Sequence, residues 1–149
     1  MPENHMPENR AKPALSLTDL SRRGLEQGIK QVQAAGSPLQ HPFLMDEAGR
    51  LHVLFDAAGD SDPMELAFHA IKRKLPNVQR CALVIDSRLT YARGKKWDAI
   101  VVMACERGAA EGEVWAQRYV PKGWFKKFRV EGESEMVAKA RDFISAALA

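Results

Sequence analysis

Three charged residues on two predicted strands have side chains that could bind a small anion together. Asp86 and Arg88 lie in a predicted strand at 81–91, and Arg118 lies in another at 113–120. Our predicted pairing places them on one face around Ile100, where two guanidinium groups could hold a carboxylate or phosphate by bidentate hydrogen bonds and Asp86 could position one of them. The alternative is a cross-strand ion pair on a partly solvated face.

The opposite face of these strands is predicted to be apolar. A turn near Arg93 and Gly94 places Leu83 opposite Cys105, and the next hairpin brings Trp115 and Tyr119 to the same side. A shift of one residue in either pairing would separate the three charged residues, because successive side chains of a strand point to opposite faces.

The segment KGWFKKFRV offers a second kind of chemistry, the binding of nucleic acid. It interleaves four cations, Lys122, Lys126, Lys127 and Arg129, with aromatic residues that include Trp124. Cations follow the phosphates of a single strand, and aromatic rings stack on its bases. The alternative is an edge strand whose rings pack inward and whose lysines discourage edge-to-edge pairing.

The charge distribution agrees with a basic binding surface in the second half of the chain. The formal net charge of the whole chain is only +3, but residues 72–129 contain fourteen basic and five acidic side chains, a net charge of +9. The cluster Lys72, Arg73 and Lys74 belongs to this excess. Any polyanion is therefore expected to approach the sheet or the helix that carries this cluster.

The two cysteines, Cys81 and Cys105, are predicted to be reduced, inert core residues. Both lie in apolar strands, where burial raises the pKa of a thiol, and Glu106 points away from Cys105 because strand neighbours face opposite sides. The sequence contains no HExxH, CxxC, calcium-loop, phosphate-loop or GxSxG motif. We therefore expect no metal site and no cofactor, and no catalytic residue is assigned.

The residue pattern predicts three helices and five to six strands. Apolar residues recur at helical spacing over 17–35 and 63–75, and again from a cap at Ser134 to Ala147. Gly24 and Gly28 lie within the first apolar stripe and indicate close packing, either on the chain's own sheet or between two copies of the helix. Strands are predicted at 42–55 as a hairpin, and at 81–91, 97–106, 113–120 and 125–130. The fold class is therefore α+β, a mainly antiparallel sheet with the order αββαβββ(β)α.

The chain length and composition favour one domain. A chain of 149 residues, with 46% hydrophobic and 28% charged residues, is long enough to form an independent core. We assign residues 15–149 to this domain and residues 1–14, which repeat MPEN, to a disordered or added tail. No apolar run is long enough for a membrane span, so we expect no membrane and a cytoplasmic location.

Part of the chain resembles a group of small, uncharacterised bacterial proteins. The runs ALVIDSRLTY, WDAIVVMACERG and GEVWAQRYVP contain DAI, ERG and AQRY in the order in which that group has them. The resemblance covers about a quarter of the chain, from Ala82 to Pro121. It implies a bacterial source but no activity, so no functional residue is transferred.

Three classes of function remain open from the sequence. The first is a non-catalytic protein-interaction domain, in which the glycine-containing helix or an edge strand meets a protein partner or a second copy in a homodimer. The second is an anion- or nucleic-acid-binding domain that uses the basic sheet region. The third is an enzyme without a recognisable motif.

Overall fold

The computed structural model describes residues 14–55 and 62–149. The tail assigned to residues 1–14 lies outside these ranges except for Ala14. The elements follow in this order: α1 (Leu17–Ala35), β1 (Phe43–Asp46), β2 (Leu51–Val53), α2 (Pro63–Lys74), β3 (Arg80–Thr90), a short 3₁₀ turn η2 (Ala92–Gly94), β4 (Lys96–Glu106), β5 (Glu113–Val120), β6 (Arg129–Ala138) and α3 (Phe143–Leu148).

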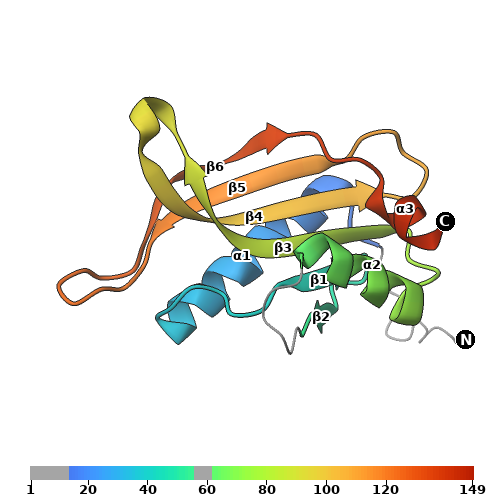
Figure 1. Cartoon of the computed structure of the whole chain (residues 1–149), viewed down its shortest axis with the longest axis horizontal. Helices are drawn as coiled ribbons and strands as arrows, with labels where there is room; N and C mark the ends of the chain where they lie inside the picture. Colours follow the sequence, from blue (N-terminus) through green and yellow to red (C-terminus); the bar gives the residue numbers. More distant parts are fainter. Residues whose placement is uncertain (1–13, 56–61) are drawn as a thin grey trace, which may run out of the picture.

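The six strands form one antiparallel sheet in the order β2-β1-β3-β4-β5-β6 (Figure 1). Together with three helices in the described residues, this confirms the predicted α+β fold and element order. None of the helices in residues 14–55 and 62–149 has the length and apolar character needed to cross a membrane.

Helix α1 covers one face of the sheet. The Ser16 hydroxyl caps it by accepting a hydrogen bond from the Asp19 amide, and Gly36 ends it in the left-handed conformation. A Cβ atom on Gly28 would lie 2.7 Å from Ile100 Cγ2, and one on Gly24 would lie 3.2 Å from Val102 Cγ2. The two glycines therefore let α1 approach its own sheet, which decides against the contact between two helices.

Helices α2 and α3 pack against each other and cover only one end of the opposite face (Figure 1). Their apolar side chains, including Ile71 and Ile144, form a core with Leu83, Cys81 and Cys105. Farther along the same face, a smaller apolar cluster consists only of strand residues, namely Ile85, Leu89, Ala99, Val101, Val114 and Ala116. Among the residues that the structure describes, no helix packs on this part of the face.

The strand register differs from our prediction at two places. Cys81 lies opposite Cys105, and Leu83 lies opposite Met103, so the β3–β4 pairing is shifted by two residues and the faces are preserved. Between β4 and β5 the shift changes the faces: Trp115 lies opposite Val102, and Tyr119 lies opposite Asp98. Trp115 and Tyr119 therefore point toward α1, not toward the face of the thiols.

The chain after β5 also differs from the sequence prediction. The predicted helix from Ser134 is wrong over its first part, because this segment belongs to β6 and pairs with β5. Two register shifts interrupt the pairing, and the buried Gln117 amide donates hydrogen bonds to the carbonyls of Glu131 and Gly132 at one of them. Pairing with β5 therefore decides the structure of this segment, although the apolar residues of 136–140 recur at helical spacing. Only Phe143–Leu148 is helical, behind the cap Asp142.

Candidate functional site

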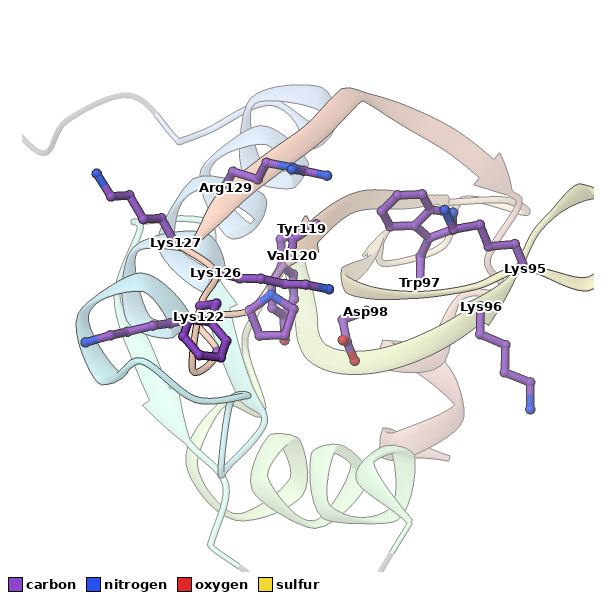
Figure 2. A pocket seen from close by; sticks show the side chains of 13 residues that line it. Lys95, Lys96, Trp97, Asp98, Tyr119, Val120, Lys122, Lys126, Lys127 and Arg129 are labelled. Atoms are coloured by element: carbon purple, nitrogen blue, oxygen red, sulfur yellow. The ribbon is translucent and has the colours of Figure 1, made fainter.

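A cleft of about 680 Å³ (Figure 2) is lined by segments at the end of the sheet remote from α2 and α3, whose positions Figure 1 shows. One wall comes from the start of β4, after the β3–β4 turn, and the other comes from the connection between β5 and β6. The residues that line the cleft are Lys95, Lys96, Trp97, Asp98, Tyr119, Val120, Pro121, Lys122, Gly123, Phe125, Lys126, Lys127 and Arg129.

Six of the lining side chains are basic and only one is acidic. The cations Lys95 and Lys96 come from the β4 wall, whereas Lys122, Lys126, Lys127 and Arg129 come from the β5–β6 connection. In Figure 2, Lys126 and Arg129 point toward the β4 wall, whereas Lys96, Lys122 and Lys127 extend outward at the rim, and Asp98 is the single carboxylate among the lining residues. Cations on facing walls focus a positive potential into the cleft, which favours an anion with several charges.

The nucleic-acid-binding residues predicted from the sequence are brought together at this cleft. Lys122, Lys126, Lys127 and Arg129 all line it, while Trp124 lies beside it on the same connection. Arg129 also forms an ion pair with Glu131 at 3.2 Å. The basic segment is therefore largely a connection between strands, and only Arg129 begins a strand.

The aromatic residues of this connection have two different environments. The side chains of Trp124 and Phe125 are both 92% exposed, with their ring centroids 6.3 Å apart. Phe128 packs on Tyr119 with ring centroids 5.8 Å apart and joins the core beneath α1. The alternative interpretation, an edge strand with rings packed inward, therefore fails for Trp124 and Phe125 and holds only for the Phe128 ring.

The predicted anion site of Asp86, Arg88 and Arg118 is not assembled, which corrects our expectation. Asp86 lies opposite Ile100, on the α1 face, whereas Arg118 lies opposite Ala99, on the other face. The Arg118 guanidinium stacks 4.8 Å from the Tyr91 ring centroid and 5.2 Å from that of Trp97. The separation follows from the alternation of side chains along β5, because the true register differs in parity from the predicted one.

Asp86 has a structural role that the sequence did not reveal. Its Oδ2 accepts a hydrogen bond of 2.6 Å from the Tyr119 hydroxyl and one of 2.8 Å from the Leu39 amide. Burial and the nearby Asp98 charge raise the pKa of Asp86, although both hydrogen bonds act in the opposite direction. Asp86 thus ties the connection after α1 to β3 and β5, directly beneath the cleft.

Sequence reasoning missed the contribution of the β4 wall. The run Lys95-Lys96-Trp97 follows the β3–β4 turn, and its cations become part of the cleft only because the β5–β6 connection lies across from it. Lys95 Nζ lies 4.4 Å from the Trp97 ring centroid, so this ring is occupied by the cations of the chain itself. The two adjacent lysines were the available signal in the sequence.

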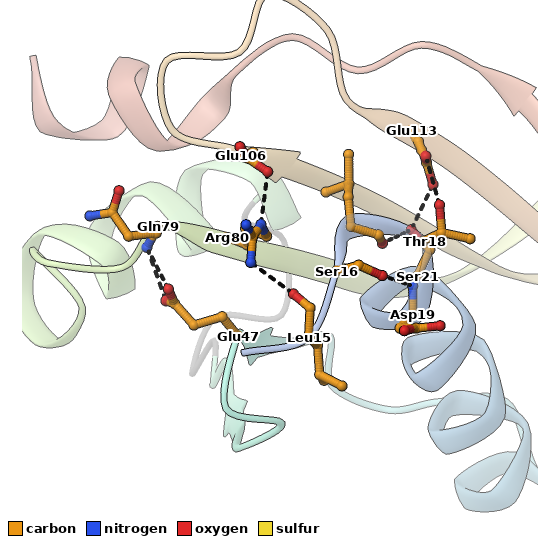
Figure 3. A network of polar contacts seen from close by, with 11 residues as sticks. Leu15, Ser16, Thr18, Asp19, Ser21, Glu47, Gln79, Arg80, Glu106 and Glu113 are labelled. Atoms are coloured by element: carbon orange, nitrogen blue, oxygen red, sulfur yellow. Dashed lines mark hydrogen bonds and ion pairs between the residues drawn. The ribbon is translucent and has the colours of Figure 1, made fainter. Parts of the chain in front are cut away.

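A second polar constellation lies around the start of α1 and is occupied by contacts within the chain (Figure 3). Arg80 forms an ion pair with Glu106 at 2.7 Å and donates a hydrogen bond to the Leu15 carbonyl. The Ser21 hydroxyl donates to both the Leu17 carbonyl and a Glu113 oxygen. These groups hold the N-terminal end of α1 on the sheet, so we assign them a structural role.

Both thiols lie in the core, as the sequence predicted. Cys81 and Cys105 are unpaired and fully buried. Burial raises the pKa of the Cys105 thiol to about 12 and raises the pKa of Cys81 well above its ordinary value. Within residues 14–55 and 62–149, no three His, Cys, Asp or Glu side chains are grouped as metal ligands.

Comparisons of the chain with known protein families, with curated proteins and with solved structures find no match. The resemblance of residues 82–121 to small bacterial proteins stays a prediction.

Proposed function

We propose that this protein is a small, non-catalytic domain that binds single-stranded nucleic acid in the cleft between the start of β4 and the β5–β6 connection. The observation that carries the proposal is that six cations from two separate segments line one cleft, together with the exposed Phe125 ring. A single strand presents both partners that such a cleft needs, a row of phosphates and a series of flat bases.

The exposed aromatic residues favour a nucleic acid over a small anion. A small anion needs cations alone, and the Phe125 ring, which is 92% exposed, adds nothing to its binding. Base stacking on an aromatic ring contributes about 1–3 kcal/mol per base and tolerates any sequence. Trp97 is less suited to this role than Phe125, because Lys95 and Arg118 already lie against its ring.

A protein-interaction function is the second candidate, and a different surface supports it. Ile85 and Leu89 are partly exposed and border the buried Val101 on a part of the sheet that no helix in residues 14–55 and 62–149 covers. The neighbouring edge strand β6 also exposes Met136 and Val137. A protein partner or a second copy of the chain would bury this surface. Sedimentation of a single monomeric species at high micromolar concentration would argue against the homodimer.

A reducing, cytoplasmic location is part of the proposal. Two buried thiols that lie opposite each other without forming a disulfide are typical of proteins in such a compartment.

The test compares two triple variants that remove the same charge from different surfaces. One replaces the cleft residues Lys122, Lys126 and Lys127 with alanine, and the matched control replaces Lys72, Arg73 and Lys74 of α2. Binding of a fluorescent single-stranded oligonucleotide is followed by anisotropy over a range of salt concentrations. Because each phosphate contact contributes about 0.7 to the slope of log K against log salt, we expect the cleft variant to lose about 2 from that slope.

The α2 control should keep most of the affinity of the parent protein. Equal losses of affinity in the two variants would show that oligonucleotide binding depends only on net charge, and the proposed site would be rejected. Vesicles containing an anionic lipid provide a second arm, since exposed aromatic residues flanked by lysines also suit a membrane surface. If the protein binds these vesicles and does not bind oligonucleotides, the ligand of the cleft is an anionic lipid surface and not a nucleic acid.

A further inference from the structure

The cleft contains one feature that a general polyanion site does not need. Asp98 is the single carboxylate among six lining cations, and it lies on β4 opposite Tyr119. In Figure 2 its side chain occupies the space between the β4 wall and the β5–β6 connection. A negative charge in this position repels phosphate, so it weakens rather than strengthens non-selective binding.

We propose that Asp98 makes the cleft selective for guanine, an inference that rests on the proposed binding of single-stranded nucleic acid. Within residues 14–55 and 62–149, no hydrogen bond or ion pair engages the Asp98 carboxylate, although cations line the same cleft. Its two neighbours across the strands are Arg88 on β3, which forms no ion pair with it, and Tyr119 on β5, whose hydroxyl donates to Asp86. Both Asp98 oxygens therefore keep their acceptor capacity for a ligand.

The hydrogen-bonding chemistry of the bases determines which one suits this acceptor. A carboxylate only accepts hydrogen bonds, so it needs donors on the base. Guanine presents N1–H and the 2-amino group side by side on its Watson–Crick edge, which matches the two oxygens of a carboxylate. Adenine and cytosine present one amino group beside an acceptor nitrogen. Uracil presents one N–H between two carbonyl oxygens, which the carboxylate repels.

The surrounding residues allow this contact in a single-stranded ligand. The bases of a single strand are unstacked and expose their Watson–Crick edges, whereas a duplex hides them. Phe125 lines the opposite wall and offers a ring for stacking, and Lys126 and Arg129, which point toward the β4 wall in Figure 2, are placed to meet the phosphates. Asp98 then acts as a specificity residue that distinguishes bases, while the cations supply the affinity.

The experiment measures affinities for four short single strands of equal length and charge. One contains uridine only, and the others replace alternate uridines by guanosine, inosine or adenosine. Inosine keeps the N1–H of guanine but lacks its 2-amino group, so it removes one of the two proposed donors. We expect the guanosine strand to bind about tenfold more tightly than the uridine strand, with the inosine strand between them.

Two variants with the same change in charge then test the residue. Asp98→Asn should abolish the preference for guanosine and strengthen binding of the uridine strand, because a repulsive charge is lost. The control Glu133→Gln, on the exposed part of β6 outside the cleft, should leave the preference unchanged. Circular dichroism and thermal unfolding confirm that each variant is folded.

The outcomes separate the two proposals. If none of the four strands binds, the proposed function itself fails. If all four bind with equal affinity, or if the guanosine preference survives in Asp98→Asn, nucleic-acid binding stands and the role of Asp98 is rejected.

Discussion

The Tyr119 hydroxyl donates a hydrogen bond of 2.6 Å to Asp86 Oδ2 across the sheet. Tyr119 lies on β5 and is fully buried, while Asp86 lies on β3 and also accepts from the Leu39 amide. This contact joins three segments that are distant in sequence, directly beneath the floor of the cleft. It exists only because β4, which lies between the two strands, places both side chains on the α1 face.

Removal of this hydroxyl should destabilise the fold. In Tyr119→Phe, Asp86 loses its shortest hydrogen bond while it stays half-buried, so the free energy of unfolding should fall by about 1–3 kcal/mol. Urea unfolding followed by circular dichroism measures the change. Tyr91→Phe is the matched control, because the buried Tyr91 hydroxyl forms no hydrogen bond within normal geometric limits in the described residues. A similar loss in both variants would contradict the assigned role.

Asp46 and Asp86 should make opposite contributions to the dependence of stability on pH. Burial opposes ionisation of Asp46, but hydrogen bonds from His52, Arg50 and Ala48 outweigh it and lower the pKa of this carboxyl below its ordinary 3.8. Asp46 therefore stabilises the fold above pH 3.8, and this contribution is lost as pH falls through the lowered pKa. The pKa of Asp86 is raised from the same ordinary value, so its contribution is fully present below 3.8 and is lost as pH rises through the raised pKa.

The pH experiment compares Asp46→Asn and Asp86→Asn with the parent protein between about pH 7 and about pH 3. The parent's stability advantage over Asp46→Asn should shrink toward acidic pH, whereas its stability relative to Asp86→Asn should increase. Chemical unfolding at each pH gives both differences, and titration shared by all three proteins cancels. If the two stability differences changed with pH in the same direction, one of the two carboxyl environments would be misassigned.

The close approach of α1 to the sheet should make Gly28 less tolerant of substitution than Gly24. A Cβ at position 28 lies 2.7 Å from Ile100 Cγ2, whereas one at position 24 meets Val102 and Val84 methyl groups at 3.2 Å. Alanine gains about 1 kcal/mol of helix propensity at either position, but overpacking typically costs about 1–3 kcal/mol. Urea unfolding should therefore give a lower free energy of unfolding for Gly28→Ala than for Gly24→Ala. The reverse order would refute the packing argument.

The exposed rings should matter for binding and not for stability. Phe125 lines the cleft and Trp124 does not, although both are 92% exposed. Phe125→Ala should weaken oligonucleotide binding by about tenfold, consistent with about 1–3 kcal/mol for one stacked base. Trp124→Ala should have a smaller effect, and both variants should unfold within about 0.5 kcal/mol of the parent. Anisotropy titrations and unfolding curves give these values, and unchanged binding in Phe125→Ala would remove the stacking role.

The amino-acid sequence by itself determined the elements whose signals are local. Helix α1 followed from its apolar stripe between Ser16 and Gly36, and β3, β4 and β5 followed from their apolar strand segments. The thiols were correctly placed in the core because both lie in predominantly apolar strand segments. The basic character of 122–129 was also visible, since charge and aromatic content are properties of composition.

Tertiary structure alone decided which of these residues meet. The turn between β4 and β5 sets the parity of their register, and the change of parity moved Arg118 away from Asp86 and brought Tyr119 to it. Pairing with β5 turned Arg129–Ala138 into a strand in spite of its partly helical pattern. The cleft, in turn, is lined by Lys95 near the start of β4 and by Lys126 from the β5–β6 connection. No local pattern encodes their proximity, because it depends on how the strands are aligned.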